Sequence, residues 1–227
     1  MRGSAKLAGP TTCEHRYGVF LRPDARTSRT VSDICRLLQH QFGLISAAAF
    51  PPHITLIGSI ASTVQPKQFS DRVAAQLQGT EPFTVTLDGL IDNPGHSLVL
   101  DASKDHEKNK NLTLTALAAA VDEAVQSMID PSIPGIAEPF TDDGFRAHFS
   151  LASHDFLDRP DLHEEVASFV SDVLDDLPDS FLARYVTIYR FTSAQWAQKW
   201  WEDMTWEHVT SIELGNTTGK VDNHGLR

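Results

Sequence analysis

Two histidine motifs of the same form constrain this chain more than any other feature of its sequence. They are His53-Ile-Thr-Leu and His148-Phe-Ser-Leu. In a β-strand, residues two positions apart project from the same face of the sheet. Each motif therefore predicts a strand that carries an imidazole and a hydroxyl, from Thr55 or Ser150, on one face. The apolar residues between them are expected to face the core.

The elements around the motifs recur in the same order. In each half a helix leads into the histidine strand, and a second helix and two further strands follow. After a strand at 17–22, the first half comprises a helix capped by Ser28 and ended by Gly43, the motif strand, a helix at 66–78 and strands near 82–91 and 97–102. The second half comprises a helix at 112–129, a strand at 145–152, a helix near 161–177 and strands at 184–191 and near 208–214. We predict one α+β domain over residues 1–227, with halves at about 16–103 and 111–215 and frayed ends.

Composition limits the partners of the chain. The formal net charge of −11 argues against binding of long nucleic acid, which needs a basic surface. No apolar run matches a signal peptide or a membrane span, so a cytoplasmic protein without membrane contact is expected, and a monomer is favoured.

Cys13 and Cys35 are expected to be reduced thiols. The ten histidines do not follow metal-binding spacings, so we expect no metal and no cofactor.

The two motifs together supply the groups that cleavage of a phosphodiester needs. Imidazole titrates near neutrality, so one of His53 and His148 can act as general base while the other, protonated, acts as general acid. Thr55 and Ser150 can donate hydrogen bonds to the phosphoryl oxygens. Two such strands facing one cleft would support in-line attack at phosphorus without a metal ion. Which histidine is the acid stays open at this point.

A third copy of the short pattern tests how specific the motif is. His208-Val-Thr has the same spacing, but it is not followed by leucine and has no equivalent in the other half of the chain. A His-x-Ser/Thr triplet alone is short enough to occur by chance. We therefore predict a structural role for His208.

The motif residues resemble the 2H phosphoesterases, a family that includes cyclic phosphodiesterases and 2′-5′ RNA ligase-like proteins. Further likeness lies in residues 17–24, in Pro52 before the first motif, and in residues 186–190 and 205–209. The resemblance implies two pseudo-symmetric lobes, each an antiparallel sheet backed by helices, with the four motif residues facing a central cleft. It also implies that the histidines share acid and base duties while the hydroxyls hold phosphate oxygens. Ala147 departs from the family pattern, because proline often precedes the motif histidine.

Three further residues are predicted to bind substrate. Strand alternation points Tyr189 and, in the first strand, Phe20 toward the cleft, where an aromatic ring can stack on a nucleobase. Simple packing is the alternative for both. Arg146 shares strand parity with His148, so it can add positive charge beside the phosphoryl group, and a solvated arginine is its alternative.

Four tryptophans crowd the last hairpin: Trp196, Trp200, Trp201 and Trp206. They suit either a lid over the substrate or a hydrophobic clasp. We favour the clasp, with Trp206 in the core.

The function predicted from these features is hydrolysis of a cyclic phosphodiester, such as a nucleoside 2′,3′-cyclic phosphate, to a phosphomonoester. The resemblance also allows RNA-end processing or 2′-5′ RNA joining. A non-catalytic nucleotide-binding module and a metal hydrolase that uses His148, His154 and Asp155 are the alternatives from other classes. Each phosphoesterase hypothesis predicts a small nucleotide or an RNA end as the substrate.

Overall fold

The computed structural model describes residues 15–133, 140–194, 196 and 199–216. Its largest sheet is antiparallel and has the strand order β2-β1-β8-β9. These strands are β1 (His15–Arg22), β2 (Ile54–Ile60), β8 (Tyr185–Thr192) and β9 (Thr205–Glu213). The four-stranded sheet therefore combines strands from both halves of the sequence.

The remaining strands form two smaller antiparallel sheets. A three-stranded sheet has the order β4-β5-β6, and a two-stranded sheet pairs β3 with β7. The strands are β3 (Phe83–Thr86), β4 (Leu90–Asn93), β5 (Ser97–Asp101), β6 (His148–Ala152) and β7 (Ser180–Ala183). Each of these sheets also takes strands from both sequence halves.

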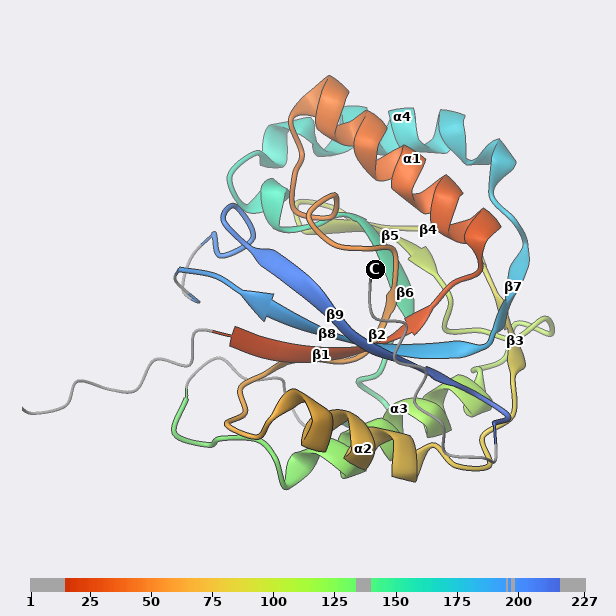
Figure 1. The fold of residues 1–227 in the computed structure, drawn as a ribbon. Helices are drawn as coiled ribbons and strands as arrows, with labels where there is room; N and C mark the ends of the chain where they lie inside the picture. The colour runs from red at the N-terminus through yellow and green to blue at the C-terminus, as the bar shows by residue number, and fades with distance from the viewer. Residues whose placement is uncertain (1–14, 134–139, 195, 197–198, 217–227) are drawn as a thin grey trace, which may run out of the picture.

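Helices cover the outer faces of the sheets, as Figure 1 shows. On one side, α1 (Ala25–Phe42) and α4 (His163–Val173) lie over the three-stranded sheet, and α1 contacts both α4 and β6. On the other side, α2 (Pro66–Gln76) and α3 (Leu112–Gln126) pack together against the four-stranded sheet. This arrangement confirms the predicted α+β class of antiparallel sheets backed by helices.

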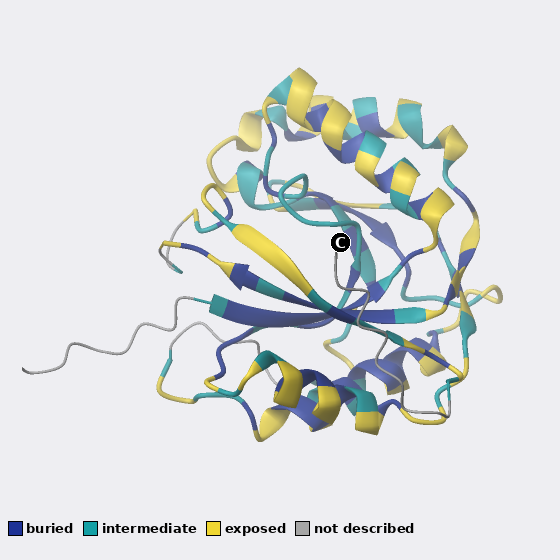
Figure 2. Ribbon diagram, viewed as in Figure 1, coloured by how far each residue is buried: buried dark blue, intermediate teal, exposed yellow. Residues whose placement is uncertain are grey.

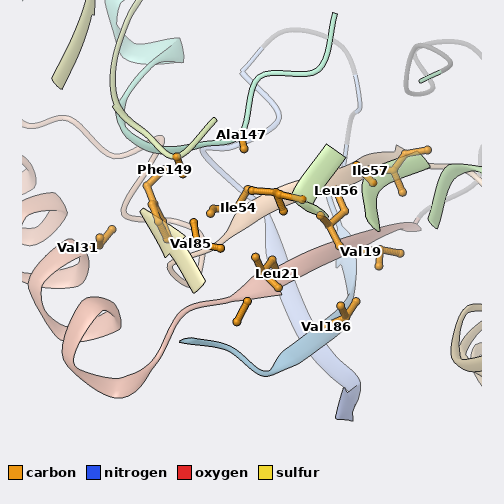
Figure 3. Close-up of a cluster of buried hydrophobic side chains, with 14 of the residues drawn as sticks. Val19, Leu21, Val31, Ile54, Leu56, Ile57, Val85, Ala147, Phe149 and Val186 are labelled. Carbon is orange, nitrogen blue, oxygen red and sulfur yellow. The ribbon is translucent and has the colours of Figure 1, made fainter. Parts of the chain in front are cut away.

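The core follows the predicted alternation of the strands. Ile54 and Leu56 of β2 are buried among the side chains of β1 and β8 (Figure 3). Val186 and Ile188 of β8 are fully buried in the same cluster. In the colouring of Figure 2 the sheets are mostly buried, whereas the helices alternate between buried and exposed residues. The opposite face of the four-stranded sheet is thus left to residues between these positions.

Several predicted boundaries were wrong for identifiable reasons. The first helix begins at Ala25 because the Asp24 side chain, not Ser28, caps it by accepting from the Thr27 amide at 2.8 Å. Its end at Gly43, with φ 73°, is confirmed. The strand predicted at 82–91 is split into β3 and β4, where Gly89 takes a positive φ of 85°.

The second half differs from prediction in three places. Strand β6 begins at His148 rather than at 145, because the Phe145 amide closes a turn by bonding to the Thr141 carbonyl at 3.0 Å. Helix 161–177 is reduced to α4, with 3₁₀ turns at Pro160–Leu162 and Leu174–Asp176, and another lies at His154–Leu157. Strand β7 was missed.

No helix in the described part of the chain is long and apolar enough to cross a membrane. Cys35 is a buried thiol, and burial raises its pKa to about 12. Cys13 lies outside the described residues.

Candidate active site

Both motif histidines are held in the same way by the backbone. The Nδ1 atom of His53 lies 2.7 Å from the Pro51 carbonyl oxygen, and Nδ1 of His148 lies 2.7 Å from the Arg146 carbonyl oxygen. A carbonyl oxygen can only accept, so each Nδ1 carries a proton. In the neutral ring, Nε2 is therefore unprotonated and can accept a proton. In the charged ring, Nε2 is protonated and can donate one. Each motif is built so that one nitrogen fixes the ring and the other is available for chemistry.

The fold brings the two motifs together from different sheets. His53 directly precedes β2 in the four-stranded sheet, whereas His148 opens β6 in the three-stranded sheet. Strands β2 and β6 contact each other. The imidazoles are close enough that the charge of His148 lowers the pKa of His53. The structure thus brings the two histidines near each other from different sheets.

A cavity of about 490 Å³ opens beside the motifs. His53, Thr55 and Ser150 line it, together with one face of α1 and with residues 46–52. His148 is half-buried and does not line this cavity among the described residues. The cavity is large enough for a nucleotide-sized ligand, and three of the four motif residues face it.

His53 lies in apolar surroundings. The Phe20 ring meets its imidazole edge-on with 4.3 Å between ring centroids, and Phe50 lies at 5.5 Å. Burial is the main cause that lowers the pKa of His53 to about 4, and the charge of His148 acts in the same direction. The hydrogen bond to Pro51 opposes the shift without cancelling it. His53 is therefore neutral at neutral pH, with the lone pair on Nε2.

The position of the Phe20 ring depends on Gly18. A Cβ atom at residue 18 would lie 2.3 Å from Cζ of Phe20 and 3.1 Å from a ring carbon of Phe191. Phe20 is only 4 % exposed, so its ring lies on the backbone of Gly18 with little room to move. Glycine at this position therefore lets Phe20 lie against His53.

The loop that leads into His53 is anchored by Asp155, in the 3₁₀ turn that follows β6. The Asp155 carboxylate accepts hydrogen bonds from the Ile45 and Ser46 amides at 3.0 and 2.9 Å and from the Ser46 hydroxyl. From the other side, Trp206 Nε1 donates to the Ala49 carbonyl at 3.0 Å. Asp155 thus holds loop amides, which differs from the ligand role considered for it. Among the described residues, no three His, Cys, Asp or Glu side chains gather as a metal site.

Comparison with known proteins places this geometry in a family. The family model of the 2′-5′ RNA ligase superfamily matches residues 23–169, which is well over half of the chain and includes both motifs. The chain belongs to the 2′-5′ RNA ligase superfamily. Membership confirms the resemblance to the 2H phosphoesterases and supports a phosphoesterase enzyme.

Solved structures of the superfamily fold share the architecture at low sequence identity. Escherichia coli LigT in its apo form aligns with a TM-score of 0.52 and 14% identity over 88% of this chain and 97% of LigT. LigT complexed with 3′-AMP aligns with a TM-score of 0.50 and 13% identity over 88% of this chain and 98% of LigT. A protein described as a phosphoesterase aligns with a TM-score of 0.52 and 15% identity over 88% of this chain and 98% of that protein. No curated protein matches the sequence. The structural similarity thus supports the superfamily fold.

The predicted substrate-binding residues of this superfamily member lie in three different places. Phe20 lines the cavity beside His53. Tyr189 is 8 % exposed and packs on Phe20 at 5.9 Å, behind the cavity wall. Arg146 is exposed, donates to the Phe145 carbonyl at 3.0 Å and lines a separate cavity of about 300 Å³. A role in substrate binding stays a prediction for all three.

The prediction for the tryptophans was wrong for Trp206, which is 41 % exposed. Its indole lies on the outer strand β9 and bonds to loop residue Ala49, as described above. Trp201 is the buried member, at 7 % exposure, and it stacks on His154 at 4.6 Å. Trp196 and Trp200 line the cavity.

Arg16 also lines the cavity and was missed. Its Nη1 donates to the Ser59 hydroxyl at 2.6 Å, and its guanidinium lies 4.5 Å from the centroid of the Trp196 ring. Arg16 is four positions before Phe20 in β1, so strand alternation places both on the same face. That parity is the signal that would have identified it.

Proposed function

We propose that this protein hydrolyses a cyclic phosphodiester, such as a nucleoside 2′,3′-cyclic phosphate, to a phosphomonoester by a two-histidine mechanism without a metal ion. The observation that carries the proposal is the matching pair of Nδ1–carbonyl hydrogen bonds at His53 and His148. Each bond fixes the tautomer and orients Nε2 as the reactive atom. By contrast, both ring nitrogens of the buried His163 form hydrogen bonds within the protein, to the Gly95 amide and the Asp92 carboxylate.

The roles of the two histidines follow from their surroundings. His53 is the general base, because its pKa of about 4 keeps Nε2 unprotonated at neutral pH. It removes a proton from water as the water oxygen attacks phosphorus. His148 is the general acid, and its Nε2–H protonates the ribose oxygen as the bond from that oxygen to phosphorus breaks. A positive charge on His148 also favours neutral His53, so the base and the acid states support one another.

Thr55 and Ser150 stabilise the charge on the phosphoryl group. Both hydroxyls face the cavity, each two residues after its histidine. They donate to the non-bridging oxygens, whose charge increases in the transition state. Neutral hydroxyl donors are suited to this because they bind the anion without changing the protonation of the adjacent imidazoles.

A small nucleotide is the substrate class that best fits the cavity. The volume of about 490 Å³ matches one nucleotide rather than a duplex, and the chain has a net charge of −11. Aromatic rings of Phe50 and Trp200 lie in the wall, 5.8 Å apart, where a base can stack. LigT, which shares the fold, was crystallised with 3′-AMP.

The direct test is turnover of a panel of nucleoside 2′,3′-cyclic phosphates by the protein in the presence of EDTA. We expect conversion to nucleoside monophosphate that is insensitive to the chelator. Binding of the panel without turnover would instead support a nucleotide-binding module. Turnover that EDTA abolishes would contradict the metal-free mechanism.

The pH dependence tests the assignment of His53 as base. Protonation of the base removes activity on the acid side of the profile of kcat/KM, which reports the free enzyme. Because the pKa of His53 is lowered to about 4, activity should persist as the pH falls through 6.5 and decline only near pH 4. Phe20→Ala removes the apolar ring from His53, so it should move this decline toward higher pH. A decline centred near 6.5 in the wild-type protein would contradict the assignment.

A further inference from the structure

A polar cluster lies on the same face of the four-stranded sheet as the motif residues, outside the cavity described above. Arg22 Nη1 donates to the Ser211 hydroxyl at 3.2 Å, and the Thr187 and Ser211 hydroxyl oxygens are 3.1 Å apart. His208 Nε2 lies 2.9 Å from the same Ser211 oxygen. The Tyr185 ring supports the guanidinium of Arg22, with 4.3 Å to the ring centroid. Four side chains from β1, β8 and β9 thus converge on one point.

A β-bulge creates this convergence. Strand β9 pairs with β8 through Tyr189↔His208 and Thr187↔Ser211, and the register shifts between Ile188 and Tyr189. The shift places His208 and Ser211, three residues apart, on one face. In a regular strand, Thr210 would lie on the same face as His208. Here Thr210 faces the core instead, opposite Ile188 and only 3 % exposed. Bulges commonly re-aim side chains in this way near functional sites.

The register of the sheet places the cluster close to the reaction centre. Phe20 is paired with Thr55 on one side and with Thr187 on the other, so the three side chains share one face. Neighbouring strands are about 4.8 Å apart, which puts Thr187 roughly 10 Å from Thr55 across the sheet. One substrate can therefore reach both the motif residues and the cluster.

The cluster carries a positive charge although the chain as a whole is acidic. Arg22 is half-buried and forms no ion pair within the described residues, whereas Arg190 on the same sheet is paired with Glu207 at 2.8 Å. The nearby Glu213 carboxylate instead accepts from the Tyr185 hydroxyl at 3.5 Å. A guanidinium has five N–H donors, of which the Ser211 contact uses one. Arg22 thus presents positive charge and donors beside the Ser211 hydroxyl.

We propose that Arg22, His208 and Ser211 form a subsite for a second phosphate group of the substrate, with the fully buried Thr187 holding the Ser211 hydroxyl in place. The proposal rests on the proposed function and narrows the substrate class to molecules with another phosphate near the cyclic one. That phosphate is either the 5′-phosphate of a mononucleotide or the internucleotide phosphodiester of an RNA end. Arginine and hydroxyl donors recognise the oxygens that these groups share.

The experiment compares three substrates: a nucleoside 2′,3′-cyclic phosphate, its 5′-phosphorylated form, and a dinucleotide that ends in the same cyclic phosphate. For the wild-type protein, we expect kcat/KM to be at least about tenfold higher for one of the two substrates with a second phosphate, the scale of a charge-assisted hydrogen bond. The substrate that gains identifies the source of the phosphate. Equal values for all three substrates would overturn the subsite while leaving the proposed function intact, and no turnover of any substrate would count against the function itself.

Arg22→Met is expected to remove the gain and to leave the simple cyclic phosphate within about twofold of the wild type. Arg22→Lys should restore part of the gain, because the charge returns without the planar fork. Arg72→Met is the matched control, since this exposed arginine lies on α2, over the other face of the sheet. It should leave the gain unchanged. An equal loss on all three substrates in Arg22→Met would contradict a subsite for the second phosphate.

Discussion

Replacing His53 or His148 with alanine is expected to lower kcat for a cyclic phosphodiester by at least about a hundredfold, with a much smaller effect on KM. A positioned general acid or base contributes about 10²–10⁴ in rate, and alanine removes it entirely. The double variant should be little worse than the poorer single variant, because the two groups act as one unit. Steady-state kinetics on the best substrate of the panel measure these effects.

His106→Ala is the control for this pair, because His106 is highly exposed and lies in the loop after β5. It should retain wild-type activity. Thermal unfolding of all variants separates loss of chemistry from loss of fold. Activity within tenfold of the wild type in a folded His53→Ala or His148→Ala variant would refute the two-histidine mechanism.

Gly18→Ala is expected to reduce both stability and activity, although it adds only one methyl group. The new Cβ would overlap Phe20, which is packed between Gly18, Phe191 and His53. Overpacking of this kind costs about 1–3 kcal/mol in the free energy of unfolding. As the Phe20 ring is displaced, His53 should become better solvated, so the acid decline of kcat/KM should move toward higher pH.

Gly58→Ala is the matched control for stability. Its Cβ would meet Cγ2 of Thr55 at 3.5 Å, an ordinary van der Waals contact. The free energy of unfolding should therefore change by less than for Gly18→Ala, as measured by denaturant unfolding. If the two glycine variants were equally stable and kept the same pH profile, Phe20 would have room to move and Gly18 would not position it.

The motifs could be predicted because their information is local. Alternation within a strand decides which side chains share a face, and Ile54 and Leu56 are buried in the core as that rule requires. The fold class and the family followed from the order of elements and from the two motifs. The positions of Asp155 and Trp206 depend on contacts between segments far apart in sequence, which periodicity does not encode.

The errors have the same origin. Sequence alternation alone does not predict that Ser211 shares a face with His208, because the bulge that places it there depends on pairing with the neighbouring strand. Trp206 was expected in the core, but its strand lies at the edge of the sheet. The short strand β7 was missed because half of its four residues are exposed.

The pairing of β1 with β8 has a consequence for how the protein is made. Residues 15–22 find their partner only at residues 185–192, near the end of the chain. Contacts of such long sequence separation form slowly and carry a large loop-closure entropy. We therefore expect β1 to lack its β8 partner during synthesis until residues 185–192 have been made. We expect the catalytic centre to be among the last features of the protein to assemble.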